Sequence, residues 1–170
     1  MKTNIYLAAY KDFSDYGLLR TFCDSITSDM KKEDTTFFVT TGECGDNTCM
    51  KYARENGFNI EDWFPDEKFA EYKKECMRSG HWHEFYNTLK AEKNKFVSRA
   101  DHVVFVWDYD QKNNGIGYGI KLAGKNSKTL SIILPDKKEV HVFTPKKPDT
   151  AYVYSLANNK MQFVGTKPKE

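Results

Sequence analysis

Residues 35–46, with the sequence TTFFVTTGECGD, combine residue types that suit the binding of an anion. A β-branched and aromatic run predicts a strand that ends at Gly42 and Gly45, and a helical pattern follows directly. A glycine turn between a strand and a helix places backbone N–H groups and the positive end of the helix dipole at one point. The segment therefore indicates a phosphate site, although the same glycines also occur in turns that bind no ligand.

Three acids could give such a site catalytic chemistry: Glu43, Asp46 and Asp108. Cleavage of an N-glycosidic bond needs a carboxylate near the anomeric carbon and a donor for the leaving base. Asp46 also suits a helix N-cap, and Asp108 also suits the end of a strand. Glu43 has less structural reason to be acidic, so it is our first candidate for a catalytic residue.

A site that binds a nucleotide without cleaving it needs rings for the base and cations or N–H groups for the phosphates. The chain offers both kinds of group, most of them near the ends of its predicted strands, whereas Lys93 lies within the predicted helix at 82–100 and is suggested by the family resemblance described below. The candidate rings are Tyr10, Trp107 and Tyr118, and the candidate phosphate-binding groups are Lys11, Lys93, Gly42, Gly45 and the segment Gly115, Ile116 and Gly117, with Ala9 beside them.

Strand and helix patterns alternate along the first 135 residues. We predict strands at 4–10, 35–41, 58–64, 102–107 and 128–134, and helices at 16–32, 47–56, 69–77, 82–100 and from Gly117 onward. This order predicts an α/β fold, a Rossmann-like three-layer sandwich with a mainly parallel five-stranded sheet. Ligands in such sheets bind beyond the C-terminal strand ends, where residues 9–11, 41–46 and 108–118 would lie.

The pattern changes after Pro135 to alternating apolar residues around Asn158 and Asn159, which predict a hairpin turn. We therefore expect a nucleotide-binding domain at 1–135 and a small antiparallel β appendage at 136–170 that packs on the same domain. Its aromatic residues would cover the edge of the sheet or form a dimer contact, and edge cover is the preferred alternative.

Composition limits the partners. The 170 residues include 26 basic and 24 acidic ones, a net charge of +2, so we expect no nonspecific binding of nucleic acid. No segment has the length of an apolar membrane span and no secretory signal is recognisable, which favours a cytoplasmic protein without a membrane partner.

Neither cysteines nor histidines form a pattern typical of a metal site. The spacing of Cys44 and Cys49 is not that of a zinc ligand pair, so we expect four free thiols. His81 and His83 are two residues apart with no third ligand nearby in the sequence. We expect neither a metal nor a cofactor.

Five motifs in a fixed order resemble those of the SLOG superfamily of Rossmann-like nucleotide binders. The superfamily includes the DprA-type DNA-processing proteins and the Lonely Guy phosphoribohydrolases. The chain looks most like a small bacterial and phage branch related to YspA and YpsA. The matching residues are Tyr10-Lys11-Asp12-Phe13, Gly42 with Gly45 and Asp46, Phe64-Pro65-Asp66, Lys93-Asn94 with Ala100-Asp101, and Trp107-Asp108 with Gly115-Ile116.

The resemblance implies a nucleotide-derived ligand at the strand ends, a role for Asn94 beside Lys93, and a homo-oligomer, because relatives commonly pair through helices. Ile116 stands where the family has a threonine, and Lys11 and Lys93 stand where it has basic residues that are commonly arginine. These departures favour sensing or sequestration of the ligand over its hydrolysis. A phosphoribohydrolase-like N-glycosidase is the alternative, and an interaction protein that uses the C-terminal hairpin is a third.

Overall fold

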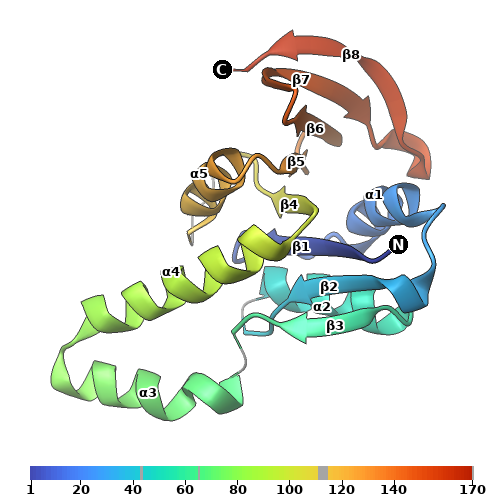
Figure 1. Cartoon of the computed structure of the whole chain (residues 1–170). Helices are drawn as coiled ribbons and strands as arrows, with labels where there is room; N and C mark the ends of the chain where they lie inside the picture. The colour runs from blue at the N-terminus through green and yellow to red at the C-terminus, as the bar shows by residue number, and fades with distance from the viewer. Residues whose placement is uncertain (43, 65, 111–114, 170) are drawn as a thin grey trace.

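One eight-stranded sheet runs through the protein, in the order β3-β2-β1-β4-β5-β6-β7-β8 (Figure 1). The structure is a computed structural model that describes residues 1–42, 44–64, 66–110 and 115–169. Strands β1 to β5 are parallel, and β6 to β8 continue the sheet in antiparallel pairing. The strands are β1 (Thr3–Ala9), β2 (Thr35–Val39), β3 (Asn59–Asp62), β4 (His102–Val106), β5 (Thr129–Leu134), β6 (Glu139–Thr144), β7 (Lys147–Ser155) and β8 (Gln162–Pro168).

Helices cover both faces of the parallel part of the sheet. Because side chains alternate along a strand, Ile5 and Leu7 of β1 pack in the core beneath α1 and α2, whereas Tyr6 and Ala8 pack in the core beneath α4 and α5. Burial on both faces explains why β1 and β4 are almost continuously apolar. The α-helices are α1 (Tyr16–Thr27), α2 (Cys44–Glu55), α3 (Asp66–Ser79), α4 (Trp82–Arg99) and α5 (Ile116–Lys125), and 3₁₀ helices lie at Lys32–Asp34 and Ala157–Asn159.

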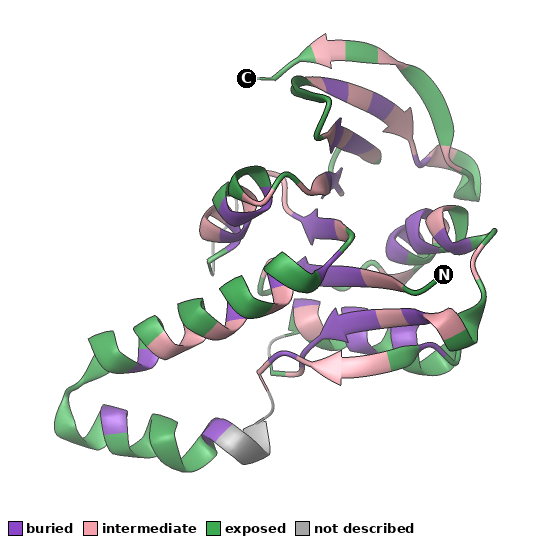
Figure 2. Cartoon of the chain, viewed as in Figure 1, coloured by how far each residue is buried: buried purple, intermediate pink, exposed green. Residues whose placement is uncertain are grey.

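A helical hairpin, α3 and α4, projects beyond the C-terminal ends of the parallel strands (Figure 1). Gly80 separates the two helices with a φ of 78°, and the N–H of His81 donates to the carbonyl of Cys76. Glycine is needed here because its left-handed conformation is unfavourable for other residues. Figure 2 shows α3 and the adjoining part of α4 as largely exposed. In the described ranges, no helix is both long enough and apolar enough to cross a membrane.

The predicted α/β class and the antiparallel C-terminal strands are confirmed, but the predicted count of five strands is wrong. Strand β6 pairs directly with β5, from Leu130 opposite Phe143 to Leu134 opposite Glu139. The free edge of β5 offers unpaired N–H and C=O groups, and a strand that adds to this edge satisfies them. Residues 139–168 are therefore part of one continuous sheet. Asn158 and Asn159, both with positive φ, lie in the connection between β7 and β8.

Candidate functional site

The candidate site lies at the C-terminal ends of β1 and β4, where the order of the strands reverses. The chain leaves β1 toward β2 on one side and returns on the other side of β1 as β4. Open α/β sheets bind ligands at such a switch point. The N–H of Tyr10 donates to the carbonyl of Val106 (3.0 Å), so Tyr10 and Trp107 occupy neighbouring positions just beyond the two strands.

The glycine turn after β2 uses its N–H groups inside the protein. The N–H of Gly42 donates to Oδ1 of Asn47 (3.0 Å), and the N–H of Gly45 donates to the carbonyl of Lys11 (2.9 Å). A Cβ atom at Gly45 would lie 2.0 Å from the carbonyl oxygen of Tyr10. The turn therefore holds α2 closely against the end of β1, and these two amides are already engaged.

Asp46 lies in the first turn of α2, which begins at Cys44 rather than at the predicted Asn47. The alternative interpretation of Asp46 as the N-cap is therefore wrong, because two helical residues precede it. Its Oδ1 accepts from the N–H of Ala9 at 3.4 Å, which links α2 to β1. Glu43, the first candidate for a catalytic acid, lies outside the described residues.

Asp108 joins the loops that follow β4 and β5. Both of its carboxylate oxygens lie 3.3 Å from the N–H of Asp136. Tyr10 lies close to both acids: burial raises the pKa of its hydroxyl, and the charges of Asp108 and Asp136 raise it further. A carboxylate engaged in this way positions a loop.

Among the residues whose burial the structure describes, Lys93 is the only buried lysine, with 5% of its surface exposed. It projects from α4 toward the start of α5, where its Nζ donates to the carbonyl of Gly115 (3.2 Å). The same Nζ lies 5.4 Å from the centre of the Trp63 ring. Burial lowers the pKa of Lys93 to about 8, and the charge of Asp46 acts in the opposite direction. In the part of the chain that is described, no carboxylate forms an ion pair with it.

Two further polar groups belong to the same region: Nε1 of Trp63, whose ring lies near Lys93, and the hydroxyl of Tyr6, whose ring packs against that of Trp63. Both are buried, and neither has a hydrogen-bond partner among the residues described. The two rings are 5.9 Å apart. Burial, and next the charge of Asp46, raise the pKa of Tyr6, so its hydroxyl keeps its proton. We call Tyr6, Trp63, Lys93 and Gly115 the Lys93 cluster. It offers three donor groups, from β1, from the segment that follows β3, and from α4.

Sequence reasoning identified Lys93 and Gly115 but missed Tyr6 and Trp63. Both missed residues belong to apolar runs that predict buried strands, and an aromatic residue in such a run usually belongs to the core. The sequence did contain one indication: each of these rings has a polar atom, which needs a hydrogen-bond partner when the ring is buried. Only the fold shows that neither atom has a hydrogen-bond partner in the described part of the chain.

Other predicted residues are not part of the cluster. Lys11 and Asn94 are exposed; Asn94 follows Lys93 on α4 and is turned about 100° away from it. Ile116 is packed in the core beneath α4 and α5. Tyr118 lies on α5, with its ring 5.4 Å from Nζ of Lys90. Gly117 occupies the first turn of α5, whereas the predicted residues 113 and 114 lie outside the described ranges.

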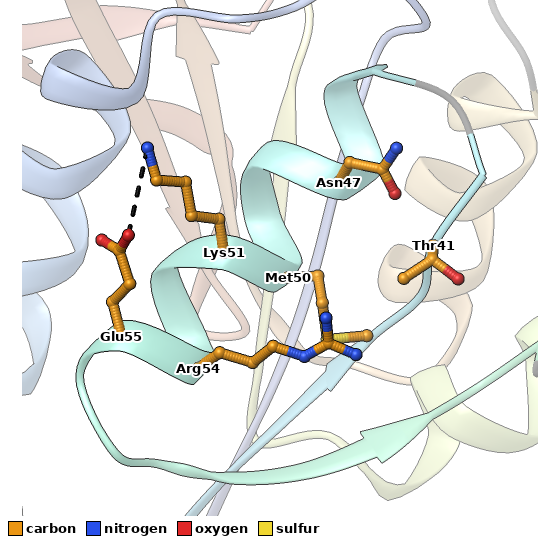
Figure 3. Close-up of a pocket in the computed structure, with 6 residues that line it drawn as sticks. All are labelled: Thr41, Asn47, Met50, Lys51, Arg54 and Glu55. Atoms are coloured by element: carbon orange, nitrogen blue, oxygen red, sulfur yellow. Dashed lines mark ion pairs between the residues drawn. The ribbon is translucent and has the colours of Figure 1, made fainter.

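A separate hollow of about 350 Å³ lies over α2, which packs on the opposite face of the sheet from α4 (Figure 3). Its lining residues are Thr41, Asn47, Met50, Lys51, Arg54 and Glu55. Figure 3 shows Lys51 and Glu55 directed together on one side of the helix, 4.0 Å apart, while Arg54 extends toward the side of Thr41. Two of these lining residues, Thr41 and Asn47, flank the glycine turn of the predicted site.

No model of a known protein family matches the sequence, and a search of curated proteins also found no match. Membership of the SLOG superfamily therefore stays a prediction that rests on the order of the five motifs.

Proposed function

We propose that the protein binds a nucleotide-derived anion at the C-terminal ends of β1 and β4, beside Lys93, and that it senses or sequesters this ligand. One observation carries the proposal: Lys93 is a buried cation without an ion-pair partner in the described ranges. An ammonium group removed from water is unfavourable unless an opposite charge compensates it. An anionic ligand would supply that charge.

The surroundings of Lys93 favour a phosphate. The N-terminus of α5 begins beside its ammonium group, and a helix N-terminus carries a positive partial charge that favours anions. Tyr6 and Trp63 add two donors that lack partners among the residues described. The donor groups of Lys93, Tyr6 and Trp63, together with the N-terminal dipole of α5, suit a phosphate, because a phosphate has several acceptor oxygens.

Aromatic side chains at the same edge support a ligand that also carries a base. Tyr10 and Trp107 are half-buried at neighbouring strand ends, and the ring of Trp107 lies 4.6 Å from that of Tyr109. Rings in such positions stack on bases irrespective of base identity. Binding is favoured over hydrolysis because Asp46 and Asp108 both accept backbone N–H groups.

The test is ligand binding by the purified protein and by Lys93→Met. The probes are AMP, cyclic AMP, ADP and ADP-ribose, measured by thermal shift and by titration calorimetry, with chromatography of the ligand after incubation. We expect at least one probe to bind, to be recovered intact, and to bind Lys93→Met at least tenfold more weakly. Lys95→Met is the matched control, since Lys95 is exposed on the same helix and pairs with Glu92.

Two results would count against the proposal. Equal affinity of the wild type and Lys93→Met would show that the ligand does not bind beside Lys93. Release of a free base from any probe would show hydrolysis and would favour the N-glycosidase alternative.

A further inference from the structure

Helix α4 is longer than the strand beside which it lies. Its 18 residues span about 27 Å, whereas the five residues of β4 span about 17 Å. The two elements are joined directly at Ala100 and Asp101, so the excess length lies at the N-terminal end of α4. That end extends past the C-terminal strand ends, as Figure 1 shows.

The helix face that is buried over the sheet continues along this overhang, where the sheet no longer covers it. At about 100° per residue, Trp82 and Tyr86 lie on the same face as Lys93. Over the sheet this face is buried, since Val97 is fully covered and Lys93 is 5% exposed. Beyond the sheet, Tyr86 is 50% and Trp82 43% exposed. Their rings are stacked, with centroids 6.5 Å apart and planes 23° apart.

Helix α3 packs against a different side of α4. The ring of Tyr72 lies 6.4 Å from that of Phe85, and its hydroxyl accepts from Oγ1 of Thr88 (3.2 Å). On the helix Phe85 is rotated by about 100° and Thr88 by about 160° from Tyr86, and the ring of Phe85 also contacts that of Tyr86 at 5.8 Å. The two exposed rings therefore face the region beyond the strand ends, on the same helix face that carries Lys93.

We propose that the base of the ligand whose anionic group Lys93 holds stacks on Tyr86 and Trp82 rather than on Tyr10 or Trp107. The inference rests on the proposed function and names the class of ligand. Tyr86 precedes Lys93 by seven residues, which is about 10 Å along the helix axis. Lys90 is exposed between Tyr86 and Lys93 on α4 and provides a second cation for the phosphates. The arrangement suits an elongated nucleotide, such as a nucleoside diphosphate or ADP-ribose, with its base about 10 Å from its distal phosphate.

The experiment compares ligands with and without a ring. Affinities of ADP-ribose, ADP and inorganic pyrophosphate are measured by titration calorimetry for the wild type, Tyr86→Ala, Trp82→Ala and Lys93→Met. We expect Tyr86→Ala to bind ADP and ADP-ribose about tenfold more weakly and pyrophosphate as the wild type does. Lys93→Met should weaken binding of all three. Phe163→Ala, which removes an exposed ring from the distant strand β8, is the control and should change nothing.

The outcomes separate the two proposals. If Lys93→Met weakens binding while Tyr86→Ala and Trp82→Ala do not, the base lies elsewhere and only this inference is overturned. This inference alone is also overturned if Trp107→Ala, and neither ring variant, loses the preference for ADP over pyrophosphate. It is likewise overturned if Tyr86→Ala and Trp82→Ala change only the elution volume on size exclusion. If none of the three ligands binds but AMP or cyclic AMP does, only this inference is overturned; if no probe of either experiment binds, both proposals fail.

Discussion

Lys93 and Gly115 depend on each other. A Cβ atom at position 115 would lie 2.9 Å from Nζ of Lys93, and Gly115 has a φ of 86°, a left-handed conformation that favours glycine. The glycine before α5 therefore makes room for the ammonium group as well as starting the helix. The sequence predicted a phosphate contact at Gly115, whereas in the structure its carbonyl accepts from Lys93.

Replacement of Lys93 by methionine should stabilise the protein without ligand. The pKa of this lysine falls from 10.5 to about 8 on folding. The unfolded state therefore binds more protons between these two values, so the free energy of unfolding of the wild type should rise as the pH increases from about 8 to 10.5. Below that window the full penalty is present, which is roughly 3 kcal/mol before loss of the bond to Gly115 is subtracted.

Urea unfolding of the wild type and Lys93→Met at pH 7 and pH 10 would measure this effect. We expect Lys93→Met to be roughly 1–3 kcal/mol more stable at pH 7, with a smaller difference at pH 10. Lys95→Met is the control for general lysine titration. A less stable Lys93→Met at pH 7 would mean that the burial of Lys93 is not a net penalty.

At the scale of elements, the close contact between α2 and β1 positions the glycine turn beside the C-terminal end of β1. Gly45 is the residue that permits it, because its missing side chain allows the carbonyl of Tyr10 to approach the helix. The sequence predicted the glycine turn and the helix after it, but it predicted the start of α2 three residues late. Local patterns do not reveal that Asn47, the predicted first residue of the helix, instead bonds back to Gly42 from within its first turns.

Gly45→Ala should therefore destabilise the protein. The new methyl group would meet a backbone carbonyl, which cannot rotate away, so we expect a loss of roughly 1–3 kcal/mol in the free energy of unfolding. Gly124→Ala is the matched control: it also lies in a helix, and its Cβ would have no other atom within 4 Å. That variant should be neutral or up to about 1 kcal/mol more stable. Similar urea midpoints for both variants would refute the close contact.

At the scale of the whole molecule, the C-terminal strands complete the core. Val140 and Leu156 belong to the hydrophobic cluster beneath α1 and α2, while Phe143 and Val153 belong to the cluster beneath α4 and α5. Both clusters thus draw residues from beyond Pro135. At the expected boundary at 135, the pairing of the strands changes from parallel to antiparallel. The homo-oligomer stays a prediction.

A chain truncated after Pro135 should not fold cooperatively. Removal of β6 to β8 exposes apolar side chains in both clusters and frees the edge of β5, which favours aggregation. Circular dichroism during urea unfolding and size exclusion would measure the outcome against the full chain. A monomeric fragment with a cooperative transition would show that residues 1–135 are an independent domain.

The sequence by itself determined the order and type of the elements as far as Pro135, because strand and helix periodicity and glycine breaks are local properties of the chain. The glycine pattern also indicated Gly115, and the resemblance to the SLOG motifs indicated Lys93. Only the tertiary structure decided that Lys93 is buried beside Tyr6 and Trp63, and that β6 to β8 extend the same sheet. Burial of a charge and pairing of strands depend on contacts between segments far apart in the chain, and no local pattern records those contacts.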